Sequence, residues 1–126
     1  MPIDGGGNVG AVGSGVVVGD YSGADEFVHG FTWTEADGFT TLDFQSNMTG
    51  LRAINRRGDI SGIYFDGVAL HGFLRPRYGT EVTIDHPDSV WTDTAVVNSR
   101  GTVAGAYWDA NSNGHGYIAI RCDSRD

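Results

Sequence analysis

The chain has 126 residues, 40% of them hydrophobic and 19% charged, which suits one globular domain with its own core and excludes a disordered chain. Eight arginines and no lysine stand against sixteen acidic residues, and the net charge of −8 excludes nucleic-acid binding by bulk electrostatics and attraction to an anionic membrane surface. The longest apolar run, residues 15–19, is too short for membrane insertion, and the single cysteine, Cys122, allows no internal disulfide and no cysteine metal site.

Strand-like segments recur along the chain at a spacing of about 43 residues, which is the signature of a repeat protein. The first kind starts with glycine, passes through a second glycine and ends on tyrosine: Gly15–Tyr21, Gly58–Tyr64 and Gly101–Tyr107. A His-Gly-aromatic segment follows each one: His29–Phe31, His71–Phe73 and His115–Tyr117. Two further matches pair Thr41–Asp43 with Thr83–Asp85, and Ile54–Gly58 with Val97–Gly101.

Each matched segment is predicted to be a β-strand. Its side chains alternate with period two and are enriched in β-branched and aromatic residues. The Asn-x-x-Gly sequence before the second and third segments is typical of a tight turn whose glycine takes a positive φ. No stretch keeps a 3.6-residue hydrophobic period, so we expect almost no helix.

One repeat is therefore predicted to hold four short strands in a meander, which the middle repeat places around 51–55, 59–65, 70–74 and 81–85. Four-stranded units of about 40 to 50 residues are typical of propeller blades. The second glycine of each Gly-x-x-x-Gly segment then marks a place without room for a side chain, or one where an aromatic ring packs. The alternative is that these glycines only mark bulges.

We predict a single all-β domain over residues 1–126, with repeats at about 9–50, 51–93 and 94–120. The third repeat lacks its fourth strand, and residues 2–4, Pro-Ile-Asp, match the Thr-Leu-Asp and Thr-Ile-Asp of that strand in the other two repeats. We therefore expect an N-terminal strand at residues 2–4 to close the last repeat, within one chain or between two, which hides a sheet edge.

Three repeats are fewer than the roughly four to eight blades of most propellers. We therefore expect a β-propeller-like fold completed by oligomerisation, with two chains head-to-tail making six blades, so that the favoured partner is a second copy in a homodimer. One alternative is a β-trefoil closed within a single chain. Another is an open head-to-tail array, because heterologous contacts need not close.

The middle repeat carries a family resemblance. Its sequence reads Ile54-Asn55-x-x-Gly58-x-Ile60-x-Gly62-x-Tyr64, then His71-Gly72-Phe73-Leu74, then Thr83-Ile84-Asp85. This resembles the bacterial HAF-type extracellular repeat family, and the resemblance runs from about residue 9 to residue 120. The first repeat departs, because Val12-Gly13-Ser14-Gly15 replaces the Ile-Asn-x-x-Gly start. The resemblance implies propeller-like repeats and a bacterial extracellular or cell-surface location, and it implies no activity.

No residue set predicts an enzyme. Nucleophilic catalysis needs serine or cysteine beside histidine and an acid, and the chain has no Gly-x-Ser-x-Gly elbow. Cys122 lies in an acidic tail, which is unfavourable to a thiolate. We therefore predict a non-catalytic protein with no catalytic residue.

Two patterns are compatible with metal binding. In a three-fold fold, His29, His71 and His115 would converge on a metal, but recurrence in every repeat favours hydrogen bonds to backbone carbonyls of each histidine's own repeat. The segment from Asp109 to Gly114 resembles half of a calcium loop without its distal glutamate, and its residues are also ordinary in hairpins. We therefore predict no metal site and no cofactor.

Aromatic residues at strand ends give the better functional lead. Flat apolar rings beside carboxylates and guanidinium groups suit sugars, whose CH faces stack while their hydroxyls find polar partners. The candidate ligand-binding residues are Trp108, Asp109, Trp91, Phe65, Asp66 and Arg75. We therefore expect a carbohydrate-binding, lectin-like module. The alternatives are that the tryptophans pack between blades, and that the protein is a structural or self-assembling extracellular repeat without a small ligand.

Overall fold

A computed structural model describes residues 7–13, 15–44 and 48–120, and in these residues it has eleven strands and no helix. The all-β prediction is confirmed. The strands are β1 (Gly7–Gly13), β2 (Val16–Ser22), β3 (Val28–Thr34), β4 (Gly38–Leu42), β5 (Thr49–Ile54), β6 (Ile60–Phe65), β7 (Leu70–Arg75), β8 (Val82–Ile84), β9 (Trp91–Val97), β10 (Val103–Trp108) and β11 (Gly114–Ala119). Nowhere in these ranges does a helix long and apolar enough to cross a membrane occur.

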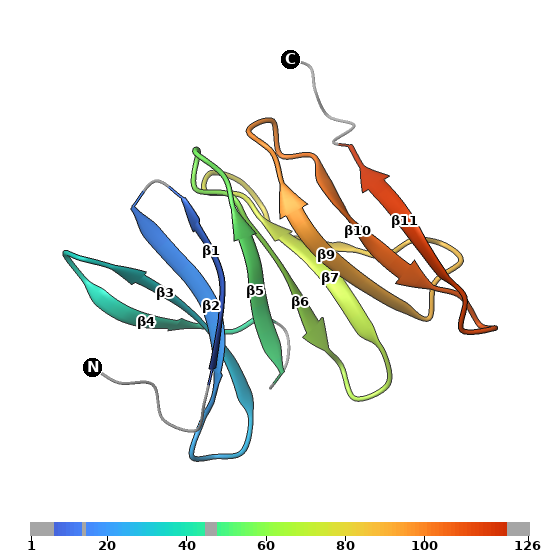
Figure 1. Ribbon diagram of the computed structural model, residues 1–126, viewed down its shortest axis with the longest axis horizontal. Helices are drawn as coiled ribbons and strands as arrows, with labels where there is room; N and C mark the ends of the chain where they lie inside the picture. Colours follow the sequence, from blue (N-terminus) through green and yellow to red (C-terminus); the bar gives the residue numbers. More distant parts are fainter. Residues whose placement is uncertain (1–6, 14, 45–47, 121–126) are drawn as a thin grey trace.

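The strands form three antiparallel sheets, each a meander in chain order. Sheet 1 contains β1 to β4, sheet 2 contains β5 to β8, and sheet 3 contains β9 to β11. Sheet 2 lies between the other two, because β5 contacts strands of sheet 1 while β6 and β7 contact β9 (Figure 1). The four strands predicted for the middle repeat coincide with β5 to β8. The strand expected at residues 2–4 lies outside the described residues.

The turns between the first and second strands of each sheet have the glycine conformation that the sequence predicts. Gly15, Gly58 and Gly101 have φ values of 78°, 93° and 82°, which a side chain disfavours. Behind two of these glycines an asparagine fixes the turn, since Asn55 Oδ1 accepts hydrogen bonds from the backbone N–H groups of Arg57 and Asp59. The Asn-x-x-Gly signal therefore locates the two hairpins that carry it, because it acts entirely within the turn.

The second glycine of each repeat pairs with the aromatic residue of the next strand, as Gly62 does with Phe73. A Cβ at Gly62 would overlap the carbonyl oxygen of Gly50 and lie 2.7 Å from the Phe73 ring, so a side chain has no room there. A bulge interrupts the β5–β6 ladder between Leu51 and Ala53, beside the same glycine. Both interpretations of the glycine therefore apply at this position.

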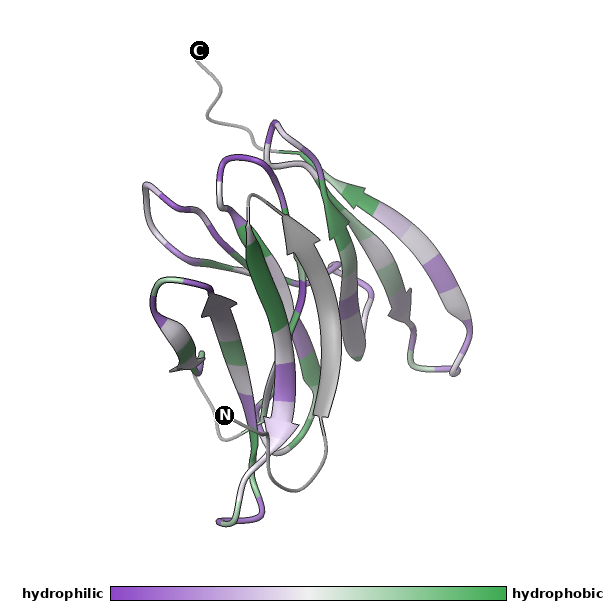
Figure 2. Ribbon diagram, turned by 60° about the vertical axis from the view of Figure 1, so that its left-hand side comes forward, coloured by the Kyte–Doolittle hydropathy of each residue, from purple (hydrophilic) through white to green (hydrophobic). Residues whose placement is uncertain are grey.

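Two hydrophobic clusters hold the sheets together, one on each side of sheet 2. The cluster between sheets 1 and 2 contains Val18, Phe44, Leu51, Ile60, Tyr64 and Phe73. The cluster between sheets 2 and 3 is smaller and contains Ala53, Leu74, Val97 and Val103. Hydrophobic residues run along the strands and polar residues gather in the loops (Figure 2). Polar side chains therefore lie mainly at the ends of the strands.

Candidate functional site

A cleft of about 510 Å³ opens where sheets 2 and 3 meet, at the end of sheet 3 where β9 begins and β10 ends. Trp91 starts β9 and Trp108 ends β10, and the two residues pair directly across the antiparallel ladder. The lining residues are Leu70, Val90, Trp91, Asp93, Trp108, Asp109, Ala110 and Ser112. A second hollow of about 430 Å³ lies beside it and shares Leu70, Val90 and Trp91.

Two tryptophans give the cleft its apolar surface. Trp91 is 42% exposed and Trp108 is 38% exposed, so each indole has one accessible part and one packed part. The packed side of Trp91 meets the ring of Phe65, whose centroid lies 5.8 Å away in a stacked arrangement. Trp108 rests over Gly114, where a Cβ would come within 3.1 Å of the indole nitrogen. Both rings are therefore held in place before any ligand binds.

Carboxylates supply the polar part of the cleft. Asp109 Oδ1 accepts hydrogen bonds from the backbone N–H groups of Asn111 and Asn113, at 2.9 and 3.0 Å. Its Oδ2 lies 3.0 Å from His115 Nε2. The hydrogen bond from His115 and then the one from the Asn113 N–H lower the pKa of Asp109 to about 2. Asp109 is thus an anion in a rigid hairpin loop, and these contacts are those of a turn residue.

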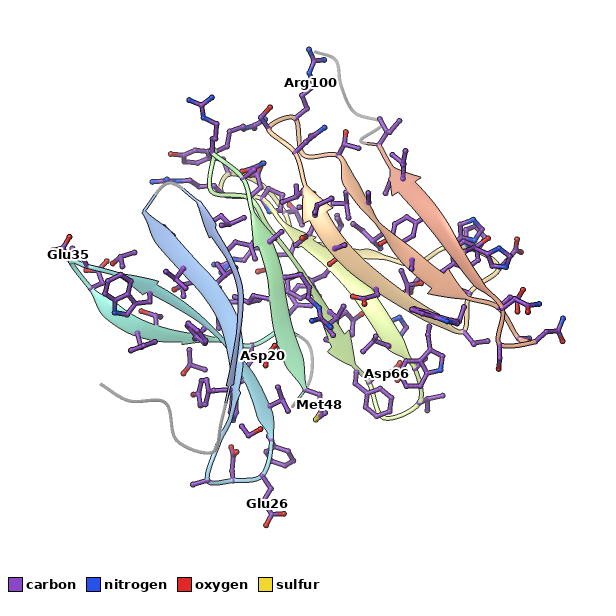
Figure 3. The ribbon with its side chains drawn as sticks, viewed as in Figure 1. Asp20, Glu26, Glu35, Met48, Asp66 and Arg100 are labelled. Atoms are coloured by element: carbon purple, nitrogen blue, oxygen red, sulfur yellow. The ribbon has the colours of Figure 1, made fainter. Side chains whose placement is uncertain are left out.

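The structure brings together most of the residues predicted to bind a ligand. Trp91, Trp108 and Asp109 line the cleft, and Phe65 supports Trp91 from behind. Asp66 follows Phe65 at the same end of sheet 2 (Figure 3). Its Oδ1 accepts backbone hydrogen bonds within its own loop and its Oδ2 lies 2.7 Å from His71 Nε2, so its oxygens are engaged.

Arg75 does not belong to this group. It pairs with Ile60 at the opposite end of the β6–β7 ladder from Phe65 and Leu70. Its Nε lies 3.1 Å from Glu81 Oε2 in an exposed ion pair. The six-residue strand β7 separates Arg75 from the tryptophans. No arginine is among the residues that line the cleft.

The recurring histidines form a second feature, which the sequence analysis did not anticipate. His71 lies between two carboxylates, with Nδ1 2.8 Å from Asp85 Oδ2 and Nε2 2.7 Å from Asp66 Oδ2. His29 lies in the same way between Asp43 at 2.9 Å and Asp25 at 3.0 Å. We call this arrangement an Asp-His-Asp clamp. Each histidine stays within its own sheet, but the acceptors are carboxylates and not the expected backbone carbonyls.

The third clamp is half complete. His115 Nε2 meets Asp109, as His71 Nε2 meets Asp66, but none of the described carboxylates lies at its Nδ1. The tyrosine that flanks each histidine is retained, since the ring of Tyr107 lies 4.9 Å from that of His115 and the ring of Tyr64 lies 5.0 Å from that of His71. Among the described residues, the clamp in sheet 3 therefore differs from the other two only in the carboxylate at the histidine Nδ1.

The clamps favour charged histidines. An imidazole donates from both nitrogens only as the imidazolium, and two carboxylates stabilise that form. The hydrogen bond to Asp43 raises the pKa of His29. Burial lowers the pKa of His71, but its hydrogen bonds to Asp66 and Asp85 outweigh burial and the net direction is upward.

Metal binding by these groups has no geometric support. The two ring nitrogens of a clamped histidine point to different carboxylates on opposite sides of the ring, so the donors do not converge on one point. Across the described ranges, no group of three or more histidine, cysteine, aspartate or glutamate side chains is arranged to hold a metal. His86, which is outside the recurring pattern, is stacked on Tyr107 with ring centroids 3.8 Å apart.

Comparison with known proteins gives no relative: no protein-family model, no curated protein and no solved structure matches this chain.

Proposed function

We propose that this protein is a non-catalytic carbohydrate-binding module that takes a sugar in the cleft between Trp91 and Trp108. The observation that carries the proposal is the pair of half-exposed, preformed indoles beside ionised or ion-paired carboxylates. Sugar CH groups stack on such rings, and sugar hydroxyls donate to carboxylate oxygens. The cleft volume lies within the range of small-ligand pockets and fits about one or two sugar rings.

The polar partners come from both sides of the tryptophan pair. Asp109 and Ser112 belong to the β10–β11 loop, and Asp93 belongs to β9. Asp93 Oδ1 is buried and lies 3.5 Å from Arg52 Nε of sheet 2, so Asp93 links the wall of the cleft to sheet 2. Since no catalytic set accompanies these groups, binding without turnover is the activity that we propose.

We further propose that the three sheets are consecutive blades of a propeller-like array. Separate meanders that stack face to face in chain order support this arrangement over a trefoil. Within this array the residue equivalent to Trp108 is Phe65 in sheet 2 and Ser22 in sheet 1, so one full cleft is proposed per chain. The resemblance to HAF-type repeats supports an extracellular or cell-surface location, which is part of the proposal.

The test is a glycan array followed by titration of each positive sugar against purified variants. Trp108→Ala should weaken binding by about fivefold or more, because a stacked ring contributes on the order of 1 kcal/mol or more. Trp33→Ala is the matched control, since this tryptophan lies on sheet 1 beside Phe39 and away from the cleft. An array without signal, or binding that is unchanged in Trp108→Ala, would contradict the proposal.

A second candidate is a structural, self-assembling repeat protein without a small ligand, and one observation favours it. The outer face of sheet 3 carries exposed aliphatic residues, with Ile118 69% and Val96 56% accessible. Such a face suits burial against another copy of the chain. The mass of the native protein tests this candidate, which predicts at least twice the 13.4 kDa of one chain. A monomer at all concentrations would exclude it.

A further inference from the structure

The second hollow, of about 430 Å³, adjoins the tryptophan cleft and has no part in the function proposed above. Leu70, Val90 and Trp91 line both hollows, so the two meet along these three residues. The remaining walls of the second hollow come from the β6–β7 loop, which begins near Asp66 (Figure 3), and from the β8–β9 loop that joins sheet 2 to sheet 3. The two hollows therefore form one groove over the junction of these sheets.

The second hollow has an apolar wall. Val68 is 84% exposed and Val90 is 44% exposed, so both side chains are accessible to a ligand. Trp91 belongs to both hollows and is supported from behind by Phe65. A sugar chain that passes Trp91 therefore continues to meet apolar surface for its CH groups.

His86 supplies a hydrogen-bond donor to the same hollow. Its Nδ1 accepts a hydrogen bond from the backbone N–H of Asp88 at 3.1 Å. An imidazole that accepts at one nitrogen carries its proton on the other, so the Nε2 of His86 is a donor. His86 lines the hollow, and within residues 7–13, 15–44 and 48–120 its Nε2 has no hydrogen-bond partner. This N–H group is therefore available to a ligand.

The ring of His86 is held in place before any ligand binds. It stacks on Tyr107 of sheet 3, with the ring planes only 7° apart. The backbone of its turn is fixed as well, because the carbonyl oxygen of His86 accepts hydrogen bonds from the N–H and the Oγ of Ser89, at 2.9 and 2.8 Å. A donor that is ordered in advance loses little conformational entropy on binding.

An acceptor lies next to this donor in the chain. Asp85 lines the same hollow, and its two carboxylate oxygens lie 2.9 and 2.8 Å from His71 Nδ1. This contact fixes the carboxylate and leaves lone pairs on its oxygens for a further donor. A sugar hydroxyl group both donates and accepts, so neighbouring hydroxyl groups of one sugar ring suit Asp85 and His86 together.

We propose that the second hollow is a further sugar subsite, so that the ligand is an oligosaccharide chain and not a single sugar. The inference rests on the proposed carbohydrate-binding function and names its ligand class. One end of the chain stacks on Trp91 and Trp108, and the other end accepts a hydrogen bond from His86 and donates one to Asp85. The second hollow takes about as many rings as the first, which gives a chain of about three or four units.

The charges of the groove restrict the chain further. Both hollows have aspartates among their lining residues, and neither has an arginine. A sugar acid would meet like charges there without a cationic partner, which is unfavourable for binding. The proposed ligand is therefore a neutral oligosaccharide.

The first test is calorimetric titration of the wild type with cello-, xylo-, manno-, laminari- and chito-oligosaccharides of about one to six units. In a series that binds, the affinity should rise at least about tenfold from disaccharide to tetrasaccharide and then level off, with one tetrasaccharide per chain. Equal affinities for the two lengths, or two tetrasaccharides per chain, would overturn the shared groove. Tetragalacturonate that binds more tightly than every neutral tetrasaccharide would overturn the neutral class.

The second test uses variants of the second hollow. His86→Phe keeps a ring on Tyr107 and removes the donor, so it should weaken tetrasaccharide binding by about three- to tenfold and leave disaccharide binding unchanged. Asp88→Ala is the matched control, because Asp88 belongs to the same turn but lines neither hollow, and both affinities should stay at the wild-type level. Val68→Arg places a long side chain at the exposed rim and should also weaken only the tetrasaccharide.

The outcomes separate this subsite from the proposed function. Binding that Trp108→Ala weakens, but that is equal for disaccharide and tetrasaccharide, would leave the carbohydrate-binding function standing and overturn the subsite. Wild-type tetrasaccharide affinity in both His86→Phe and Val68→Arg would do the same. A wild type that binds no oligosaccharide of any series would overturn both. Val68→Arg decides the question if thermal unfolding shows that His86→Phe is not folded.

Discussion

Sheets 2 and 3 share one strand pattern but differ in what covers their outer sides. In sheet 2 the histidine is held by two carboxylates, and the aliphatic residues next to the bulge are buried under sheet 3. In sheet 3 the equivalent histidine has one described carboxylate partner and the equivalent aliphatic residues are exposed. Among the described residues, sheet 2 is therefore covered on both faces, and sheet 3 is covered on one face only.

The largest expected difference between the sheets concerns the aromatic residue over the second glycine. Phe73 is completely buried and stacks on Phe44 with centroids 4.4 Å apart, whereas Tyr117 at the same position of sheet 3 is only partly buried. Phe73→Ala should lower the free energy of unfolding by about 3–5 kcal/mol, and Tyr117→Ala should cost clearly less. Urea unfolding of both variants measures this. Equal losses would show that the two sheets are packed alike.

The next prediction concerns the glycine that directly follows the recurring histidine, which is Gly72 in sheet 2 and Gly116 in sheet 3. Gly72→Ala should destabilise the chain by about 1–3 kcal/mol, because its methyl group would meet Thr94 at 2.7 Å and the Ile84 carbonyl oxygen at 3.0 Å. Gly116→Ala should be near neutral for the folding of one chain, since the space there is open. Thermal unfolding at low concentration compares them. A penalty at Gly116 as large as at Gly72 would contradict an open outer face.

The clamps predict a smaller, pH-dependent effect. The pKa values of His29 and His71 are raised by hydrogen bonds to carboxylates, so their stabilising contribution is complete below the unfolded pKa of about 6.5 and is lost as pH rises through the folded values. Unfolding free energies from pH 5.5 to 9 should therefore decrease. His71→Gln should flatten that decrease by up to about 1 kcal/mol. A decrease of the same size in His71→Gln would contradict the prediction.

The acidic side of the stability profile belongs to the loop aspartates. Asp66 has its pKa lowered to about 2, first by the Ala69 N–H and then by His71, and the pKa of Asp109 is also lowered to about 2. A lowered pKa adds stability above the unfolded value of about 3.9, and this stability is lost as pH falls toward 2. Asp66→Asn should reduce the acid dependence between pH 4 and 2. NMR titration of both carboxylates checks the underlying pKa values.

The sequence predicts features that depend on neighbouring residues, such as turns and strands. It does not predict side-chain contacts that depend on the register between paired strands. The turns form as expected because Asn55 and Gly58 act within four residues of each other. The strand positions follow from period-two patterns in the same way. The cleft was partly predictable, since Trp91 and Trp108 lie at strand ends, where rings remain accessible.

The clamps were hidden by loops of unequal length. Asp25 precedes His29 by four residues, Asp66 precedes His71 by five, and Asp109 precedes its histidine by six, so no fixed spacing marks them. The signal that was available is an aspartate in the loop after each second strand and another after each Thr-Leu or Thr-Ile pair. These partners come together only through strand pairing.

One predicted site residue is misplaced. Arg75 was expected beside the tryptophans because it is a polar residue at a strand end, but it ends β7 whereas the tryptophan cleft is near the start of that strand. The sequence shows that Arg75 lies at a strand end, and it does not show at which end of the sheet the cleft lies.

The most direct measurement of the proposed self-assembly, in which a second copy covers the outer side of sheet 3, is amide hydrogen exchange in β11 compared with β7. The account predicts that β11 amides not bonded to β10 are protected at high protein concentration and lose that protection on dilution, while β7 amides stay protected at both. Fast exchange of those β11 amides at every concentration, beside a protected β7, would contradict it.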